Sequence, residues 1–226
     1  MQAGTIIGRA WEMYKAHWRH LIPIAALVYV LISLLELVLV SLLGWVGYVL
    51  GAFAALAGVF WLQGALVIAI DDVRDGRADL SIGQTLERLT ARINTLTIAG
   101  LLASIAIGVG LVLLIVPGLF LLTIWLLIVP AIVLEGRGLA ASFSRSQELV
   151  RGYGWSVFGV IVLTVLIIIA ANIVFGILGA AVDSRWGTFV VDIVSQSVTA
   201  PFVALAWTLT YYDLRALKGA EPATAV

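Results

Sequence analysis

The chain has no cysteine and only two histidines, His17 and His20, among its 226 residues. It therefore lacks the thiolates that disulfides and most structural zinc sites need. Charged residues make up 12% of the sequence, about half of the ~25% usual in soluble domains. Basic and acidic residues balance at 13 each, so no large positive field is present to attract nucleic acid.

Recognisable catalytic motifs are also missing. The sequence has no phosphate-binding loop, dinucleotide fingerprint, HExxH or GxSxG motif. His17 and His20 have no acidic neighbour, and their spacing of three is weak evidence for a metal site. We therefore predict no metal, no cofactor and no enzymatic activity.

Apolar residues dominate instead, at 62% of the chain with a mean hydropathy of +1.13. A helix needs roughly 20 apolar residues to cross a bilayer, and continuous runs argue against a β-barrel. The sequence predicts an all-α polytopic protein that forms a single membrane domain over residues 1–226. Six spans are expected: Leu21–Leu43, Gly47–Ile70, Leu96–Val116, Leu119–Leu134 (short, with a kink near Pro130), Trp155–Leu178 and Phe189–Tyr212.

Basic residues lie almost entirely on one side of these spans. Twelve of the thirteen fall in residues 1–20, 71–95, 135–154 and 213–226, whereas Arg185 lies alone on the other side, where the turns Gly44–Val46 and Pro117-Gly118 are expected. Because cytoplasmic loops are enriched in Lys and Arg, we predict that the N-terminus and the C-terminus are both cytoplasmic.

A pattern of one amphipathic segment followed by two spans occurs three times. The predicted units are residues 5–72, 80–136 and 138–213, with 214–226 as a short cytoplasmic tail. The amphipathic segments begin at Ile7, Ile82 and Leu139, and Ser81 with Gln84 forms a capping-box pattern at the second. The alternative is that hairpins with basic flanks simply look alike.

These three amphipathic segments are predicted to be cytoplasmic interfacial helices. A basic amphipathic helix lies in the headgroup layer and attracts anionic lipid. The other interpretation is that the three helices pack on their own bundle and only orient the spans.

Each even-numbered span ends in an acid: Asp71, Glu135 and Asp213. A carboxylate at a helix C-terminus opposes the helix dipole, so a nearby arginine should compensate for it. We predict a cytoplasmic charge collar in which Glu135 pairs with Arg145 or Arg151, and Asp71 pairs with Arg88 or Arg92.

Polar residues inside the spans form a second candidate site. Glu36 lies 15 residues, about 22 Å, from the basic side of its span, and Asn172 lies about 25 Å along the fifth. Asp192, Gln196 and Thr199 share one face of the sixth. Ionisable residues in spans suggest function, here an outward-facing polar pocket between spans one, five and six. Interhelical hydrogen bonding is the alternative.

Several motifs are similar to those of a known family. Val129-Pro130-Ala131-Ile132-Val133-Leu134-Glu135-Gly136, the run Ser144–Gly152, Val116-Pro117-Gly118 and Tyr211-Tyr212-Asp213-Leu214-Arg215 resemble the membrane domain of bacterial glycerophosphoryl diester phosphodiesterases and the YciC-like small membrane proteins. The resemblance implies a six-span domain of the bacterial plasma membrane. The phosphodiesterase catalytic barrel has no counterpart in these residues, so its activity is not implied.

Two functions remain open. The first is a non-enzymatic, lipid-associated scaffold or accessory module of the bacterial inner membrane. The second is a small transporter, channel or lipid-translocating protein that uses the outward polar pocket. The expected partners are membrane lipids, anionic ones among them, and another membrane protein or a second copy of the chain; nucleic acid is not expected.

Overall fold

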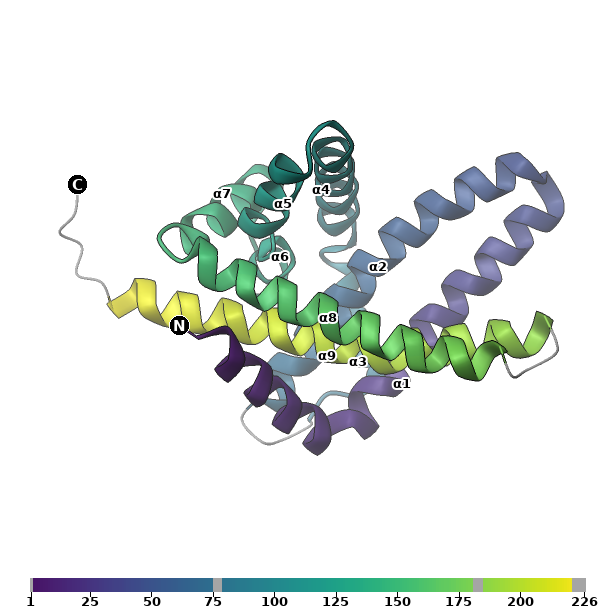
Figure 1. Cartoon of the computed structure of the whole chain (residues 1–226), viewed down its shortest axis with the longest axis horizontal. Helices are drawn as coiled ribbons and strands as arrows, with labels where there is room; N and C mark the ends of the chain where they lie inside the picture. The colour runs from purple at the N-terminus through teal and green to yellow at the C-terminus, as the bar shows by residue number, and fades with distance from the viewer. Residues whose placement is uncertain (1, 75–78, 181–184, 221–226) are drawn as a thin grey trace.

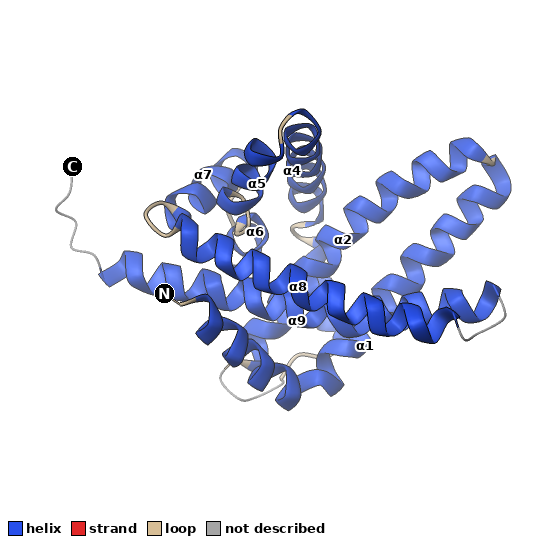
Figure 2. Cartoon of the chain, in the orientation of Figure 1, coloured by secondary structure: helices blue, strands red, loops and turns tan. Residues whose placement is uncertain are grey.

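The computed structural model of the chain describes residues 2–74, 79–180 and 185–220, and in these ranges every regular element is helical (Figures 1 and 2). The prediction of an all-α membrane protein is therefore confirmed. The elements are α1 (Ala3–Leu43), α2 (Trp45–Val73), α3 (Ile82–Thr90), α4 (Ile93–Leu113), α5 (Ile115–Ile124), α6 (Ile128–Glu135), α7 (Leu139–Val150), α8 (Gly154–Ala180) and α9 (Arg185–Ala220).

Six segments of the described residues are long and apolar enough to cross a membrane. Five are the single helices α1, α2, α4, α8 and α9, and the sixth is α5 continued by α6. They pair into the hairpins α1–α2, α4–α5 and α8–α9, which diverge from one another in Figure 1. We name the end that carries Asp71, Glu135 and Asp213 the basic end, and the opposite end of the hairpins the tip end.

The first and last spans are longer than the sequence predicted. The first amphipathic segment is not a separate helix but the first part of the 41-residue α1, which continues through Pro23. We call residues 3–20 the α1 arm. Figure 1 shows that α1 bends, and Pro23 explains a bend because proline breaks one helical hydrogen bond. Likewise, α9 continues to Ala220, so most of the predicted tail is helix, while residues 221–226 lie outside the described residues.

The turn of the α4–α5 hairpin lies at Leu114, which has extended backbone angles, and not at Pro117-Gly118 as predicted. Pro117 is the third residue of α5. Proline is tolerated there because the first-turn N–H groups of a helix have no intrahelical partner. The α1–α2 turn is made by Gly44 alone, with a φ of 57° that favours glycine.

The fourth span is broken between Ile124 and Ile128, one turn before Pro130. The Ser146 hydroxyl of α7 fills the break: it donates to the Ile124 carbonyl at 2.7 Å and accepts from the Leu127 N–H at 3.1 Å. An irregular backbone inside a membrane needs such partners. Ser146 is fully buried, so its role is to stabilise the broken span rather than to cap a helix.

The packed core lies toward the basic end. Its fully buried side chains include Leu21, Leu66, Leu96, Ile132 and Leu205, which come from all three hairpins. The separate amphipathic helices pack through one face: the buried Leu89 of α3 joins this core, and the buried Leu149 of α7 joins a second cluster with Leu127 and Tyr211. The capping box of Ser81 and Gln84 begins α3 as predicted.

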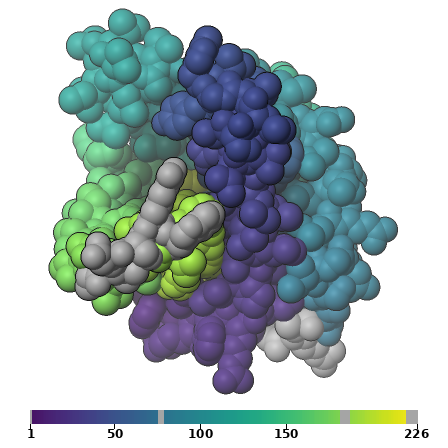
Figure 3. Space-filling view, turned by 90° about the vertical axis from the view of Figure 1, so that its right-hand side faces the viewer, coloured from purple at the N-terminus to yellow at the C-terminus, as the bar shows by residue number. Residues whose placement is uncertain are grey.

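Toward the tip end the hairpins expose large apolar side chains instead. Leu42 and Trp45 are 76% and 79% exposed at the turn of α1–α2, and Val112 is 87% exposed beside the turn of α4–α5. In Figure 3, which views the molecule from the right of Figure 1, the dark blue tip of α1–α2 and the green end of α8 occupy separate positions. Each tip therefore depends on the contact between its own two helices.

Gly47 provides a test of that contact. A Cβ at Gly47 would overlap the backbone carbonyl of Leu39 in the neighbouring helix, whereas Gly176 of α8 has open space around it. We expect Gly47→Ala to lower the free energy of unfolding by about 1–3 kcal/mol. Gly176→Ala should be neutral or stabilising by up to about 1 kcal/mol, since alanine favours helix. Thermal unfolding in detergent compares the two variants, and an equal effect of both would contradict the proposed packing.

Candidate functional site

Three consecutive residues at the basic end of α9 contact three other helices. The Tyr211 hydroxyl donates to Glu135 Oε1 of α6 at 2.8 Å, and the Tyr212 hydroxyl donates to Asp71 of α2. Asp213 accepts from Arg9 Nη2 of the α1 arm at 2.6 Å. We name Tyr211, Tyr212 and Asp213 the α9 hub, because they join α9 to all of these elements.

Helix geometry makes this arrangement possible. Successive side chains of an α-helix point about 100° apart. Three adjacent residues can therefore contact three different helices only if those helices surround α9 at this level. Tyr211 and Leu214 are fully buried at this level. The hub therefore fixes the position of the last span relative to the first two hairpins.

Glu135 is the most enclosed acid of the three. It accepts from Arg145 Nε at 3.0 Å and from Arg137 Nε at 2.9 Å, in addition to Tyr211. The side chains of Glu135 and Arg145 are only 10% and 18% exposed. The predicted pairing of Glu135 with Arg145 is confirmed. Arg151, the other arginine named for it, instead lines a groove with Phe120 and Gln147.

Arg145 is held in its charged form. Its burial would lower the pKa, but hydrogen bonds to Glu135 and to Glu148 outweigh burial and raise the pKa above its usual value. A charged arginine beside Glu135 offsets the unfavourable position of this carboxylate at the C-terminus of α6.

The predicted arginine partners of Asp71 are wrong. Asp71 contacts Tyr212 and, at 3.9 Å, Arg74, which is three residues along the same stretch of chain. Arg74 also lies over the Tyr212 ring, 4.0 Å from its centre. Tyr212 and Arg74 therefore contact Asp71 and also contact each other.

Arg88 and Arg92 lie beside this acid without an ion pair to it. They line a groove of ≈490 Å³ together with Asp71, Asp72 and Asp79. The guanidinium of Arg92 also packs close to Gly136, where a Cβ would be 2.8 Å from Nη2. All six residues of the predicted collar are thus at the basic end, although only Glu135 and Arg145 form a pair as predicted.

The contacts of the collar follow the order of the predicted units. Glu135 of the second unit pairs with Arg145 of the third, and Asp213 of the third pairs with Arg9 of the first. Asp71 of the first unit shares its groove with arginines of the second. Three small residues at the same position of each unit are fully buried: Ala10, Thr85 and Ser142.

Glu36 and Asn172 of the predicted outward pocket contact their own hairpin or helix rather than each other. The Cβ and Cγ of Glu36 lie against Gly51 of α2, its own hairpin partner, whereas we expected it to face span five or six. Asn172 is exposed and donates to the Ile168 carbonyl of its own helix at 2.9 Å. Because the hairpins diverge toward their tips, these residues contact their own hairpin or helix.

The α9 residues of that pocket lie on one helix as predicted. Asp192 and Gln196 are exposed, and Thr199 donates to the Ser195 carbonyl at 2.8 Å. Among the described residues no hydrogen bond joins Glu36, Asn172 and Asp192. The side chain of Arg185, the one basic residue predicted on this side, lies outside the described residues. A shared pocket of these groups stays a prediction.

Sequence reasoning did not assign roles to Tyr211 and Tyr212, and it interpreted Ser146 as a capping residue of its own helix. Two tyrosines at the end of an apolar span, directly before an acid, were a usable signal, because a membrane-edge tyrosine hydroxyl needs a polar partner. Ser146 gave no comparable signal, since its partners Ile124 and Leu127 are backbone groups about 20 residues away in the chain.

Comparison of this chain with protein-family models, with curated proteins and with solved structures finds no significant match. The functional proposal below therefore rests on the sequence and on the geometry of the chain.

Two arginine pairs at the basic end, Arg145–Glu135 and Arg9–Asp213, should differ in strength. Arg145→Gln leaves Glu135 enclosed with only Arg137 and Tyr211, so we expect a loss of stability on the order of 2 kcal/mol. Arg9→Gln breaks a more exposed pair, with side chains 46% and 30% exposed, and should cost less than about 1 kcal/mol. Thermal unfolding of both variants in the same detergent measures the difference; a larger effect at Arg9 would contradict the central position of Glu135.

Proposed function

We propose that the protein is a non-enzymatic, lipid-associated scaffold or accessory module of the bacterial plasma membrane. One observation carries this proposal: the three hairpins are joined at the basic end by the α9 hub and separate toward their apolar tips. Such a shape holds the three membrane hairpins in fixed relative positions. Lipid fills the space between the hairpins, and their exposed apolar sides offer surfaces to another membrane protein or to a second copy.

The packing at the basic end supports a scaffold over a transporter. Aliphatic side chains from all three hairpins meet there, and many are fully buried, as Leu66, Leu96 and Leu205 are. A transport path needs polar groups that face a shared cavity. The polar side chains of Asn172 and Thr199 instead bind carbonyls of their own helices.

The resemblance to the membrane domain of glycerophosphoryl diester phosphodiesterases fits the same proposal. In that interpretation the six spans act as a module that accompanies other activities in the membrane. The collar arginines Arg88, Arg92 and Arg151 line grooves at the basic end, where they would meet anionic headgroups of the cytoplasmic leaflet.

The proposal places the basic end in the cytoplasm. Because the chain has no cysteine, single cysteines can be introduced without background. We expect Gly187→Cys to react with a membrane-impermeant thiol reagent on intact cells and Lys218→Cys to react only after lysis. Labelling of Lys218→Cys on intact cells would contradict a cytoplasmic location of the basic end.

A vesicle assay separates a scaffold from a lipid translocator. The purified protein is reconstituted with a fluorescent phospholipid, and the fraction bleached by an impermeant reductant is followed over time. A scaffold should give the same rate as protein-free vesicles, and Glu36→Gln should give that rate too. Since an amide keeps most of the hydrogen bonding of the acid, this variant should also fold normally.

The opposite result would overturn the scaffold. If the wild-type protein accelerates lipid exchange and folded Glu36→Gln does not, the protein is a translocator that uses Glu36. A parallel measurement of ion flux in the same vesicles tests channel activity, which a scaffold should not show.

A further inference from the structure

A groove of ≈360 Å³ lies between the α1 arm, α8 and α9. This volume is within the range of about 300–1,000 Å³ that is usual for small-molecule sites. Its lining comes from three elements: Ile7, Trp11 and Tyr14 of the arm, Ile167, Ile168 and Ala171 of α8, and Val198, Thr199, Phe202 and Val203 of α9. The groove is thus built from residues almost 200 positions apart.

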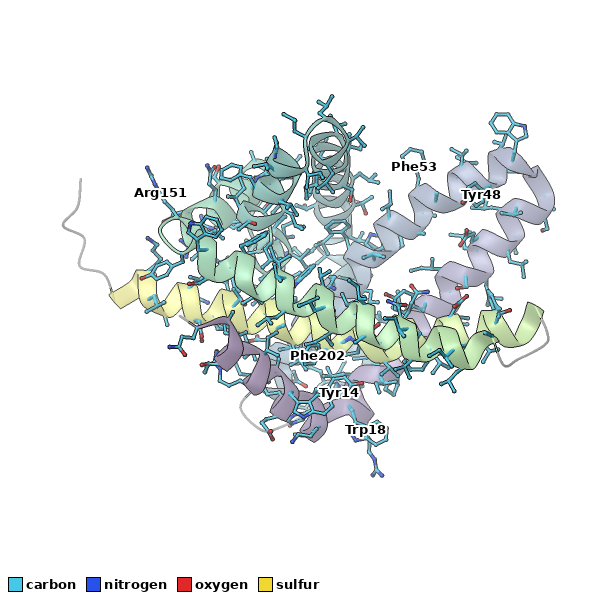
Figure 4. All side chains as sticks on the ribbon, viewed as in Figure 1. Tyr14, Trp18, Tyr48, Phe53, Arg151 and Phe202 are labelled. Atoms are coloured by element: carbon cyan, nitrogen blue, oxygen red, sulfur yellow. The ribbon has the colours of Figure 1, made fainter. Side chains whose placement is uncertain are left out.

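Aromatic rings form one wall of this groove. Trp11 stacks on Tyr14 with ring centres 5.9 Å apart, and the edge of Phe202 meets both rings at 6.3 and 6.2 Å. Figure 4 shows Tyr14 and Phe202 next to each other at the crossing of the arm and α9. These contacts hold the wall rigid and present flat apolar surface.

The two hydroxyl groups of the lining already donate to backbone carbonyls. The Tyr14 hydroxyl donates to the Val198 carbonyl at 3.0 Å, and the Thr199 hydroxyl donates to the Ser195 carbonyl at 2.8 Å. A polar solute would lose its water in this groove and gain few hydrogen bonds in return. A hydrocarbon chain loses nothing of that kind, so the lining favours an acyl chain.

Cationic side chains lie next to the aromatic wall. Lys15 Nζ is 5.9 Å from the centre of the Trp11 ring, and the Arg19 guanidinium is 5.4 Å from that of Trp18. Trp11 and Trp18 lie on the same stripe of the arm. Arg9 is engaged with Asp213, and Lys15 pairs with Glu12 at 2.9 Å through side chains that are 49% and 72% exposed. Such an exposed pair is weak, so Lys15 can exchange Glu12 for a phosphate, and Arg19 lies one helical turn farther along the arm.

We propose that this groove binds one acyl chain of an anionic phospholipid, whose phosphate is held by Lys15 and Arg19. The proposal rests on the proposed function, because a lipid-associated scaffold needs a place where a lipid is retained. Charge complementarity selects the headgroup, and the apolar lining selects the chain.

A pair of substitutions on α8 tests the acyl-chain site. Ala171 lines the groove, whereas the neighbouring Ala170 is exposed and does not. We expect Ala171→Trp to fill the groove and to lower the retention of phosphatidylglycerol about tenfold. Ala170→Trp adds the same side chain outside the groove and should retain lipid like the wild type. Native mass spectrometry of the full chain, released from phosphatidylglycerol nanodiscs into mild detergent, counts the bound lipids.

Folding is controlled in the same series. Ala171→Leu fills less space and should give an intermediate loss, while thermal unfolding and gel filtration verify that each variant is folded. Equal lipid retention by folded Ala171→Trp and Ala170→Trp would overturn the site. If Ala171→Trp instead converts a dimer to a monomer without loss of lipid, the groove holds a second copy and the proposal is wrong.

The headgroup part has its own test. The double variant Lys15→Gln, Arg19→Gln should lose the preference for phosphatidylglycerol over phosphatidylcholine in mixed nanodiscs, whereas Lys15→Arg, Arg19→Lys keeps both charges and should keep the preference. An unchanged preference in the glutamine variant would overturn the role of these cations.

Failure of this site differs from failure of the scaffold proposal. A folded Ala171→Trp variant that retains lipid, in vesicles where the wild type does not translocate lipid, rejects the groove alone. Lipid exchange accelerated by the wild type rejects the scaffold whether or not the groove holds a chain.

Discussion

The placement of three acids where membrane spans reach the basic end is the constraint on which the rest of this structure depends. Asp71 and Glu135 lie in the last turn of α2 and α6, at the negative end of a helix dipole, whereas Asp213 lies seven residues before the end of α9. All three are at the edge of an apolar medium, so each requires a donor from elsewhere in the chain. Tyr211 and Arg145 supply it to Glu135, Tyr212 to Asp71, and Arg9 to Asp213. Because each donor lies on a different helix from its acid, these bonds also hold the helices of the bundle together.

The distribution of packing follows from that assembly. Near the hub the helices are close enough to bury a common core, and the break in the fourth span is tolerated there because Ser146 binds its backbone groups. Farther from the hub, Trp61 of α2 donates to Thr97 of α4 at 2.8 Å, and Tyr14 of the α1 arm donates to the Val198 carbonyl of α9 at 3.0 Å. At the tips, large side chains such as Leu42 and Val112 are exposed. The proposed scaffold role rests on this joined base with separate hairpins, and the groove beside the α1 arm is where we propose that a lipid chain binds.

Much of this architecture could be predicted from local patterns. The six apolar runs and the capping box of Ser81 and Gln84 depend on neighbouring residues, and both are present. The predicted helix boundaries are less accurate, because proline is compatible with both turns and helices. Pro117 is predicted in a turn but lies in the first turn of α5, and Pro23 lies inside an unbroken α1. Proline alone does not tell whether its missing N–H would have had a partner.

The sequence by itself determined that this chain is a helical membrane protein with its charges concentrated at one end, because hydropathy and charge act over short stretches of chain. Only the tertiary structure decided which partner each charge has. Glu135 pairs with Arg145, ten residues away, as expected, whereas Asp71 takes Tyr212, which is 141 residues away. Glu36 contacts Gly51 rather than a distant span. Such choices depend on the angles at which hairpins cross, and those angles are set by the packing of the whole core rather than by any local run of residues.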